Sequence, residues 1–212
     1  MFKIITTVLL VCLSVNNAAI ADEEKESKKV MISRGIYSID VMHKGKKVTI
    51  KRNQDRENTI SKYYQPTHRG KVQPMAPFEP HAVETIGVLE MIDYLQQLKD
   101  KSDSLMIIDS RAKVWVKRGT IPGTVNIPFT EFKSDDRAAE IMEEEFDVLT
   151  TGSAFNFSNA KTLVMYCNGI WCGQSPTAIK KLLNFGYPAA KIKYFRGGMQ
   201  NWESLGLTVV KP

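Results

Sequence analysis

Cysteine is scarce in this chain of 212 residues, where only Cys12, Cys167 and Cys172 occur. Cys12 lies in the apolar N-terminal segment, so two cysteines remain for the rest of the chain. Small secreted folds that depend on disulfides usually carry more than one bridge. A bridge between neighbours five residues apart closes too small a ring to add much stability through chain entropy. The scarcity therefore favours cysteine chemistry over a disulfide framework.

Histidines are also few, and the chain has no internal repeat and no basic run interleaved with aromatic residues. His43, His68 and His81 show no spacing typical of metal ligands, and we expect them to be exposed to solvent. No histidine lies near Cys167 or Cys172 in sequence, so we expect no metal and no cofactor. The net charge of +6 is compatible with small anionic partners and does not indicate nucleic-acid binding.

Long apolar runs are absent beyond the N-terminus. Lys3 precedes an apolar stretch over residues 4–13 that is too short to span a bilayer, and Ala19-Ile20-Ala21 forms a small-x-small cleavage pattern. We expect residues 1–21 to be a secretory signal peptide that is cleaved after Ala21, with an uncleaved anchor as the alternative. Cleavage predicts a periplasmic or secreted protein without a membrane span.

Residues 22–82 are predicted to form an N-terminal extension. Polar and apolar residues alternate on both sides of a turn at residues 43–46, which predicts a β-hairpin within residues 35–55. Residues 61–81 contain four prolines and little periodicity, so we expect an extended linker that passes over the main domain. A protein partner is a candidate ligand of this extension.

Residues 83–212 alternate between patterns typical of strands and of helices. Helices are predicted over residues 87–99, 112–119, 134–149, 175–186 and 199–206, and strands over residues 104–109, 161–167 and 191–198. Residues 120–128 are predicted to form a turn followed by a short strand. Ser134 is a candidate N-cap, and Gly186 is expected to end its helix. The alternation predicts an α/β fold with an open, mostly parallel sheet and helices on both faces.

Cys167 ends a predicted strand, and ligands of open α/β sheets bind at such ends. Ser175 is a suitable N-cap and Pro176 suits the first helical position, so the next helix would begin at the loop. Gly169 and Gly173 are able to adopt positive φ values that let N–H groups converge on an anion. We expect a reactive Cys167 with a lowered pKa; a buried, inert cysteine is the alternative.

Three stretches together resemble the rhodanese, or sulfurtransferase, domain. "MIIDSRAKVWVKRGTIPGTVNIP" is similar to the family's strand that ends in Asp-x-Arg and is followed by a glycine-containing turn. "VMYCNG" is similar to the strand before the active-site cysteine, and "YFRGGMQNW" to the closing GG-x-x-x-W segment. The resemblance covers about residues 83–212 and implies a rhodanese-like sheet preceded by a β-hairpin extension. The whole chain looks like exported bacterial proteins of this type.

The resemblance also implies a mechanism. Cys167 would take the outer sulfur of a small sulfur-containing anion or persulfide donor and pass it from a persulfide to a thiol or another thiophilic acceptor. Asp109 and Arg111 would support the site, and the backbone amides of the loop would hold the persulfide. That loop consists of Asn168, Gly169, Ile170, Trp171, Cys172, Gly173, Gln174 and Ser175.

The loop departs from the family pattern in length and in chemistry. It is longer by two residues and lacks the arginine that often precedes the serine. Gly173 stands where a cysteine phosphatase of similar fold would carry its arginine, which argues against that activity. Cys172 is a candidate resolving thiol, and Trp171 is either a lid or a surface anchor. Two alternatives stay open: a thiol–disulfide redox protein using Cys167 and Cys172, and a non-catalytic rhodanese-like binding module.

Overall fold

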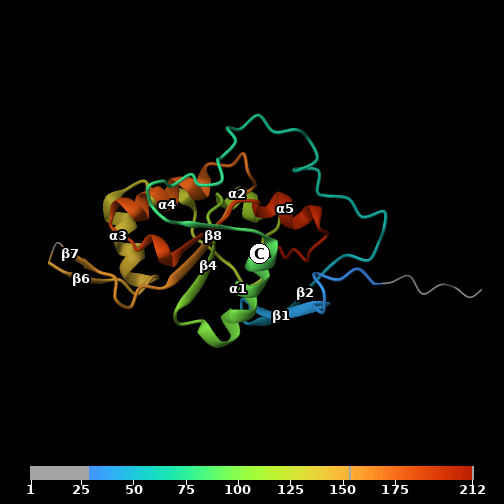
Figure 1. The fold of residues 1–212 in the computed structure, drawn as a ribbon, viewed down its shortest axis with the longest axis horizontal. Coiled ribbons are helices and arrows are strands. Elements are labelled where there is room, and N and C mark those ends of the chain that lie inside the picture. Colours follow the sequence, from blue (N-terminus) through green and yellow to red (C-terminus); the bar gives the residue numbers. More distant parts are fainter. Residues whose placement is uncertain (1–28, 153, 212) are drawn as a thin grey trace, which may run out of the picture.

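The computed structural model describes residues 29–152 and 154–211, and Figure 1 shows the path of the chain. The predicted signal peptide and Cys12 lie outside these residues. Within them, no helix combines the length and the apolar character that a membrane crossing requires. The described chain folds around a central parallel sheet with helices on both faces, which confirms the predicted α/β fold.

The central sheet has the strand order β3-β9-β8-β4-β5, and every neighbouring pair runs parallel. Its strands are β3 (Glu84–Ile86), β9 (Ile192–Phe195), β8 (Thr162–Tyr166), β4 (Leu105–Asp109) and β5 (Val125–Asn126). Asp109 pairs in register with Tyr166, the residue before Cys167. The carboxyl ends of β4 and β8 therefore bring Asp109 and Cys167 to the same edge of the sheet, where ligands bind in such folds.

Each predicted helix is present. The helices are α1 (Val88–Lys101), α2 (Lys113–Val116), α3 (Asp135–Glu144), α4 (Gln174–Asn184) and α5 (Gly198–Ser204), with single 3₁₀ turns η1 (Phe129–Phe132) and η2 (Ala189–Lys191). Figure 1 shows α3 and α4 grouped apart from α1 and α5, because the two groups belong to the cores on opposite faces of the sheet. The side chain of Ser134 caps α3 as predicted, and Gly186 follows α4 with a φ of 87°.

The sequence does not predict β3 or the small antiparallel hairpin of β6 (Leu149–Thr151) and β7 (Ala154–Asn156). Each of these strands has three residues. So short a segment cannot display the alternation of polar and apolar residues by which a strand is recognised.

The hairpin predicted within residues 35–55 is present and belongs to the main core. β1 (Ser38–His43) pairs antiparallel with β2 (Lys46–Lys51), and Lys44 and Gly45 form the turn with φ values of 49° and 74°. The buried residues Ile39, Val41 and Ile50 share a hydrophobic cluster with residues of α1. The extension therefore packs as part of the domain rather than as a separate unit.

Candidate functional site

Cys167 follows β8 directly, and the N-terminal end of α5 holds the start of its loop. The N–H group of Met199 donates to the carbonyl of Cys167 at 3.0 Å, and the N–H of Gln200 donates to the carbonyl of Asn168 at 2.8 Å. Gly198 has a φ of 52°, and a Cβ atom there would collide with the Cys167 carbonyl. The second glycine of the "RGG" sequence therefore permits the close approach that positions the cysteine.

Both cysteines of the loop are free thiols and both are buried, with 1% of Cys167 and 4% of Cys172 exposed. The Cys167 thiol donates a hydrogen bond to the backbone carbonyl of Cys172 at 3.4 Å. The side-chain amide of Asn168 donates to the sulfur of Cys172 at 3.7 Å. The loop thus brings the two thiols close to one another.

The two thiols differ in acidity, and the order is the reverse of the expectation. Burial raises the pKa of Cys167 well above its usual value, and the hydrogen bond to Cys172 adds to the increase. The pKa of Cys172 falls to about 7, chiefly because Cys167 donates a hydrogen bond to it, with further donation from the backbone of Asn168 and Gln174. The expected low pKa of Cys167 is therefore wrong: the converging donors stabilise a thiolate at Cys172.

The loop reaches this geometry without the positive φ values expected at Gly169 and Gly173. Gly173 has a φ of −91° and is the N-cap of α4, and Gly169 does not adopt a positive φ either. Ser175 lies inside the helix and is not its N-cap. Its backbone N–H and its hydroxyl instead face the sulfur of Cys167. The hydroxyl is buried and has no hydrogen-bond partner in the described part of the chain.

Asp109 and Arg111 form a buried ion pair beside the loop, with a 2.6 Å contact and at most 1% of either side chain exposed. Arg111 also donates to the carbonyl of Gly119 at 2.6 Å, and the hydroxyls of Thr120 and Tyr166 donate to Asp109. The pair connects β4, β8 and the segment after α2. Its guanidinium does not reach the thiols directly, which fits a supporting role.

Residues 60–75 of the extension, named the strap here, cover the loop. The chain between β2 and β3 has no helix or strand, and Figure 1 shows it in teal as a long open segment. The imidazole of His68 stacks on the indole of Trp171 with ring centroids 3.9 Å apart, and the N–H of Gln73 donates to the carbonyl of Ile170 at 2.8 Å. A Cβ atom at Gly70 would lie 2.5 Å from the carbonyl oxygen of Trp171. Strap and loop therefore pack in direct contact.

The expectation of solvated histidines is wrong at two of three positions. His68 is half-buried against Trp171, and His43 is buried, with its Nδ1 atom accepting from the N–H of Gly123 at 3.2 Å. His81 is exposed as expected.

Trp171 is held on the other side by Gln200, which accepts from its indole N–H at 2.9 Å. It is therefore an anchor between the strap and α5.

Tyr64 reaches the loop from the strap, although no sequence pattern marks it as a site residue. Its hydroxyl donates to the side-chain carbonyl of Asn168 at 2.8 Å and accepts from Arg111 at 3.2 Å. The ring is 5% exposed and stacks near Trp115, with centroids 6.1 Å apart. The only sequence signal was the density of aromatic residues in "KYYQPTH".

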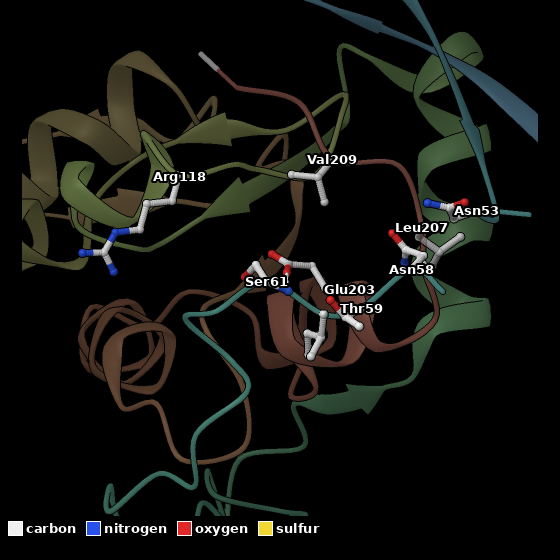
Figure 2. A pocket seen from close by; sticks show the side chains of 10 residues that line it. Asn53, Asn58, Thr59, Ser61, Arg118, Glu203, Leu207 and Val209 are labelled. Atoms are coloured by element: carbon white, nitrogen blue, oxygen red, sulfur yellow. Dashed lines mark hydrogen bonds between the residues drawn. The ribbon is translucent and has the colours of Figure 1, made fainter. Parts of the chain in front are cut away.

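A cavity of about 260 Å³ lies beside the strap (Figure 2), between its first residues and the end of α5. Ser61, Arg118 and Glu203 contribute its polar groups, and Leu207 and Val209 contribute apolar ones. Neither thiol lines it. The cavity is therefore separate from the sulfur site, whose two cysteines are covered in this state.

Comparisons with known proteins identify one matching family and several similar proteins. The rhodanese-like domain family matches residues 91–205. An HTH-type transcriptional regulator of Mycobacterium tuberculosis is 28% identical over 109 residues, which are 51% of this chain and 39% of the regulator. The chain thus spans about two fifths of the length of this relative.

Two solved sulfurtransferases are among the similar structures. The thiosulfate sulfurtransferase of Pseudomonas aeruginosa is 19% identical with a TM-score of 0.42, covering 61% of this chain and 20% of that one. A single-domain sulfurtransferase of Saccharomyces cerevisiae is 17% identical with a TM-score of 0.42, covering 61% and 95%.

Proposed function

Since the chain belongs to the rhodanese-like domain family, we propose that it is a sulfurtransferase that moves a sulfane sulfur through a persulfide on Cys167. The observation that carries the proposal is the placement of this thiol at the carboxyl end of β8, facing the first turn of α4. A helix N-terminus favours negative charge, and the persulfide is an anion.

The thiol pair supplies the proton transfer that the first step needs. Cys172 has a pKa of about 7, so a substantial fraction of it is thiolate at neutral pH and accepts the proton of Cys167. The Cys167 sulfur then attacks the outer sulfur of the donor. With thiosulfate, a new S–S bond forms on Cys167 and sulfite leaves with the electron pair of the broken S–S bond. The high basicity of Cys167 makes its thiolate a strong nucleophile.

Two hydroxyls are available to hold the terminal sulfur of the persulfide. The Ser175 hydroxyl faces Cys167, and the hydroxyl of Tyr194 is buried without a hydrogen-bond partner among the described residues. Burial raises the pKa of Tyr194, and negative charge on Cys167 and Cys172 raises it further, so the phenol stays protonated near the thiols. A buried donor without a partner is costly, and a persulfide would satisfy it.

Mass spectrometry tests the proposal. The reduced protein is incubated with thiosulfate and, separately, with a low-molecular-weight persulfide, and the peptide that contains Cys167 is analysed. We expect a gain of about 32 Da, the mass of one sulfur atom, on this peptide. The Cys167→Ser variant should show no gain. Absence of the gain with both donors in the wild type would reject the sulfurtransferase and leave the redox protein and the binding module.

A second candidate function is supported by the closeness of the two thiols, because the Cys167 thiol donates to the backbone carbonyl of Cys172 at 3.4 Å. In a thiol–disulfide redox protein, an oxidised partner would remove two electrons and two protons from Cys167 and Cys172 to form a disulfide. Mild oxidation followed by intact mass measurement checks this. A loss of about 2 Da that a dithiol reverses is expected for a redox pair. A pair that stays reduced would eliminate this candidate.

We further propose that the protein acts in the periplasm or outside the cell, because the N-terminal segment has the pattern of a cleavable signal peptide. The intact mass of the protein isolated from its own cells checks this. We expect the mass of residues 22–212. A chain that retains residues 1–21 would contradict the proposal. A protein partner of the extension stays a prediction.

A further inference from the structure

The strap reaches the thiols through a series of buried hydrogen bonds. Arg111 donates from Nη1 to the hydroxyl of Tyr64 at 3.2 Å, and this hydroxyl donates to Oδ1 of Asn168 at 2.8 Å. Nδ2 of Asn168 then donates to the sulfur of Cys172 at 3.7 Å. No member of this relay is more than 5% exposed. A group of the extension is thus connected to a sulfur atom 108 residues further along the chain.

The chemistry of the groups fixes the direction of each hydrogen bond. A guanidinium only donates, so the Tyr64 oxygen must accept from Arg111. The proton of the hydroxyl is then directed to an acceptor, and the adjacent side-chain oxygen of Asn168 is that acceptor. An amide that offers its oxygen to Tyr64 turns its N–H₂ group the other way, toward Cys172. The amide orientation therefore follows from the charge of Arg111.

We propose that Tyr64 is a positioning residue of the sulfur site: its hydroxyl orients the Asn168 amide toward the Cys172 sulfur, so that the N-terminal extension supplies part of the site. The effect on sulfur transfer rests on the proposed function, but the positioning itself concerns only the thiol. Without the Tyr64 hydroxyl, the amide of Asn168 loses the contact that selects its orientation. The Cys172 thiolate would then lose a donor that its acidity depends on.

The rest of the strap supports this role by holding Tyr64 against the loop. His68 and Gln73 contact Trp171 and Ile170, on the same loop that carries Cys172. Arg196 of the "YFRGG" segment donates to the carbonyl of Gln73 at 2.6 Å. The strap is thus fastened to the loop on the far side of Tyr64, and the relay has a fixed geometry.

Site-resolved alkylation over a series of pH values tests the proposal. Full-length Tyr64→Phe keeps the ring and removes only the hydroxyl, and Tyr63→Phe is the matched control, since its hydroxyl takes no part in the relay. Iodoacetamide labelling is quantified by mass spectrometry of the peptide that contains Cys172. We expect Tyr64→Phe to raise the pH at which labelling of Cys172 is half-maximal, called the midpoint below. Labelling at pH 7 should therefore fall about twofold to fivefold. The control should match the wild type.

The shape of the pH profile separates positioning from loosening of the fold. A loosened loop would raise the labelling rate at the high-pH plateau through better access, without moving the midpoint. Loss of the relay moves the midpoint and leaves the plateau nearly unchanged. A midpoint of Tyr64→Phe equal to that of Tyr63→Phe would overturn the proposal.

A double-mutant cycle adds a second criterion. If Tyr64 acts through Asn168, then Tyr64→Phe should have no further effect on the midpoint in the Asn168→Ala background. An undiminished effect in that background would also overturn the proposal. Labelling reports on the thiol alone, so these outcomes are independent of whether Cys167 gains sulfur from a donor.

Discussion

Cys167 and Cys172 carry the same functional group, yet their surroundings move their pKa values in opposite directions. Position in the sequence shows that both lie in one loop, but not which sulfur is buried more deeply or which one receives the donors. The sequence therefore placed both cysteines in one loop but predicted a lowered pKa for Cys167, whereas the lowered pKa is that of Cys172. The buried side chain of Asn168 makes part of the difference.

The pH dependence of labelling is the first prediction at this scale. Cys172 should be alkylated with a midpoint near pH 7, whereas Cys167 should react only at higher pH. The folded pKa of Cys172 lies below the value of about 8.5 for a free thiol. Its ionisation therefore stabilises the fold above that value, and this contribution is lost as the pH falls through 7. A lower midpoint for Cys167 than for Cys172 would contradict this order.

The ion pair of Asp109 and Arg111 gives the second prediction. Asp109→Asn leaves the buried guanidinium without its counter-charge, and such a loss costs about 3–5 kcal/mol. Urea unfolding followed by tryptophan fluorescence measures the change in the free energy of unfolding. Lys47→Ala, which removes an exposed ion pair with Asp40, is the control and should leave this free energy nearly unchanged. Equal effects of the two variants would show that burial of the pair is unimportant.

At the scale of elements, the sequence predicted best those segments that show clear periodicity or a continuous apolar run. α1 and α4 are long enough to display helical periodicity, and β4 and β8 form continuous apolar runs. β3 is too short for either signal. The contacts of the strap were not predictable for a different reason. Tyr64 and Asn168 are 104 residues apart, and no local pattern indicates a hydrogen bond between them.

The junction of the Cys167 loop and α5 gives a prediction at the element scale. Gly198→Ala places a methyl group against the Cys167 carbonyl and adds the strain of a positive φ, so it should destabilise the fold and prevent persulfide formation. Gly45→Ala is the matched control, because its φ is 74° and nothing lies within 4 Å of the added atom. The control should cost only the conformational strain, about 1–2 kcal/mol. Urea unfolding should show a clearly larger loss for Gly198→Ala.

At the scale of the whole molecule, the extension and the rhodanese-like domain share one core. Ile50 of the hairpin is fully buried in the cluster that contains Leu95 of α1 and Trp202 of α5. The alternation in β2 indicated which side chains face inward. It gave no information on what they face, because that depends on how the hairpin packs on α1.

Truncation of one hairpin side chain tests this common core. Ile50→Ala should lower the free energy of unfolding of the entire chain by about 2–5 kcal/mol within a single cooperative transition. Tyr37→Ala, at an exposed position of the extension, should have little effect. An independent early transition for Ile50→Ala, with the tryptophan signal of the main domain unaffected, would show that the hairpin folds by itself.

The hydrogen bond from the Gln73 amide to the carbonyl of Ile170 also bears on the speed of the reaction. If the proposed sulfur transfer takes place, a donor molecule must reach a sulfur that is 1% exposed, and we expect this bond to open before it does so. Amide hydrogen exchange at Gln73 would measure the frequency of opening. If opening is slow, raising the concentration or reactivity of the donor would not accelerate the proposed sulfur transfer, whereas weakening this one contact would.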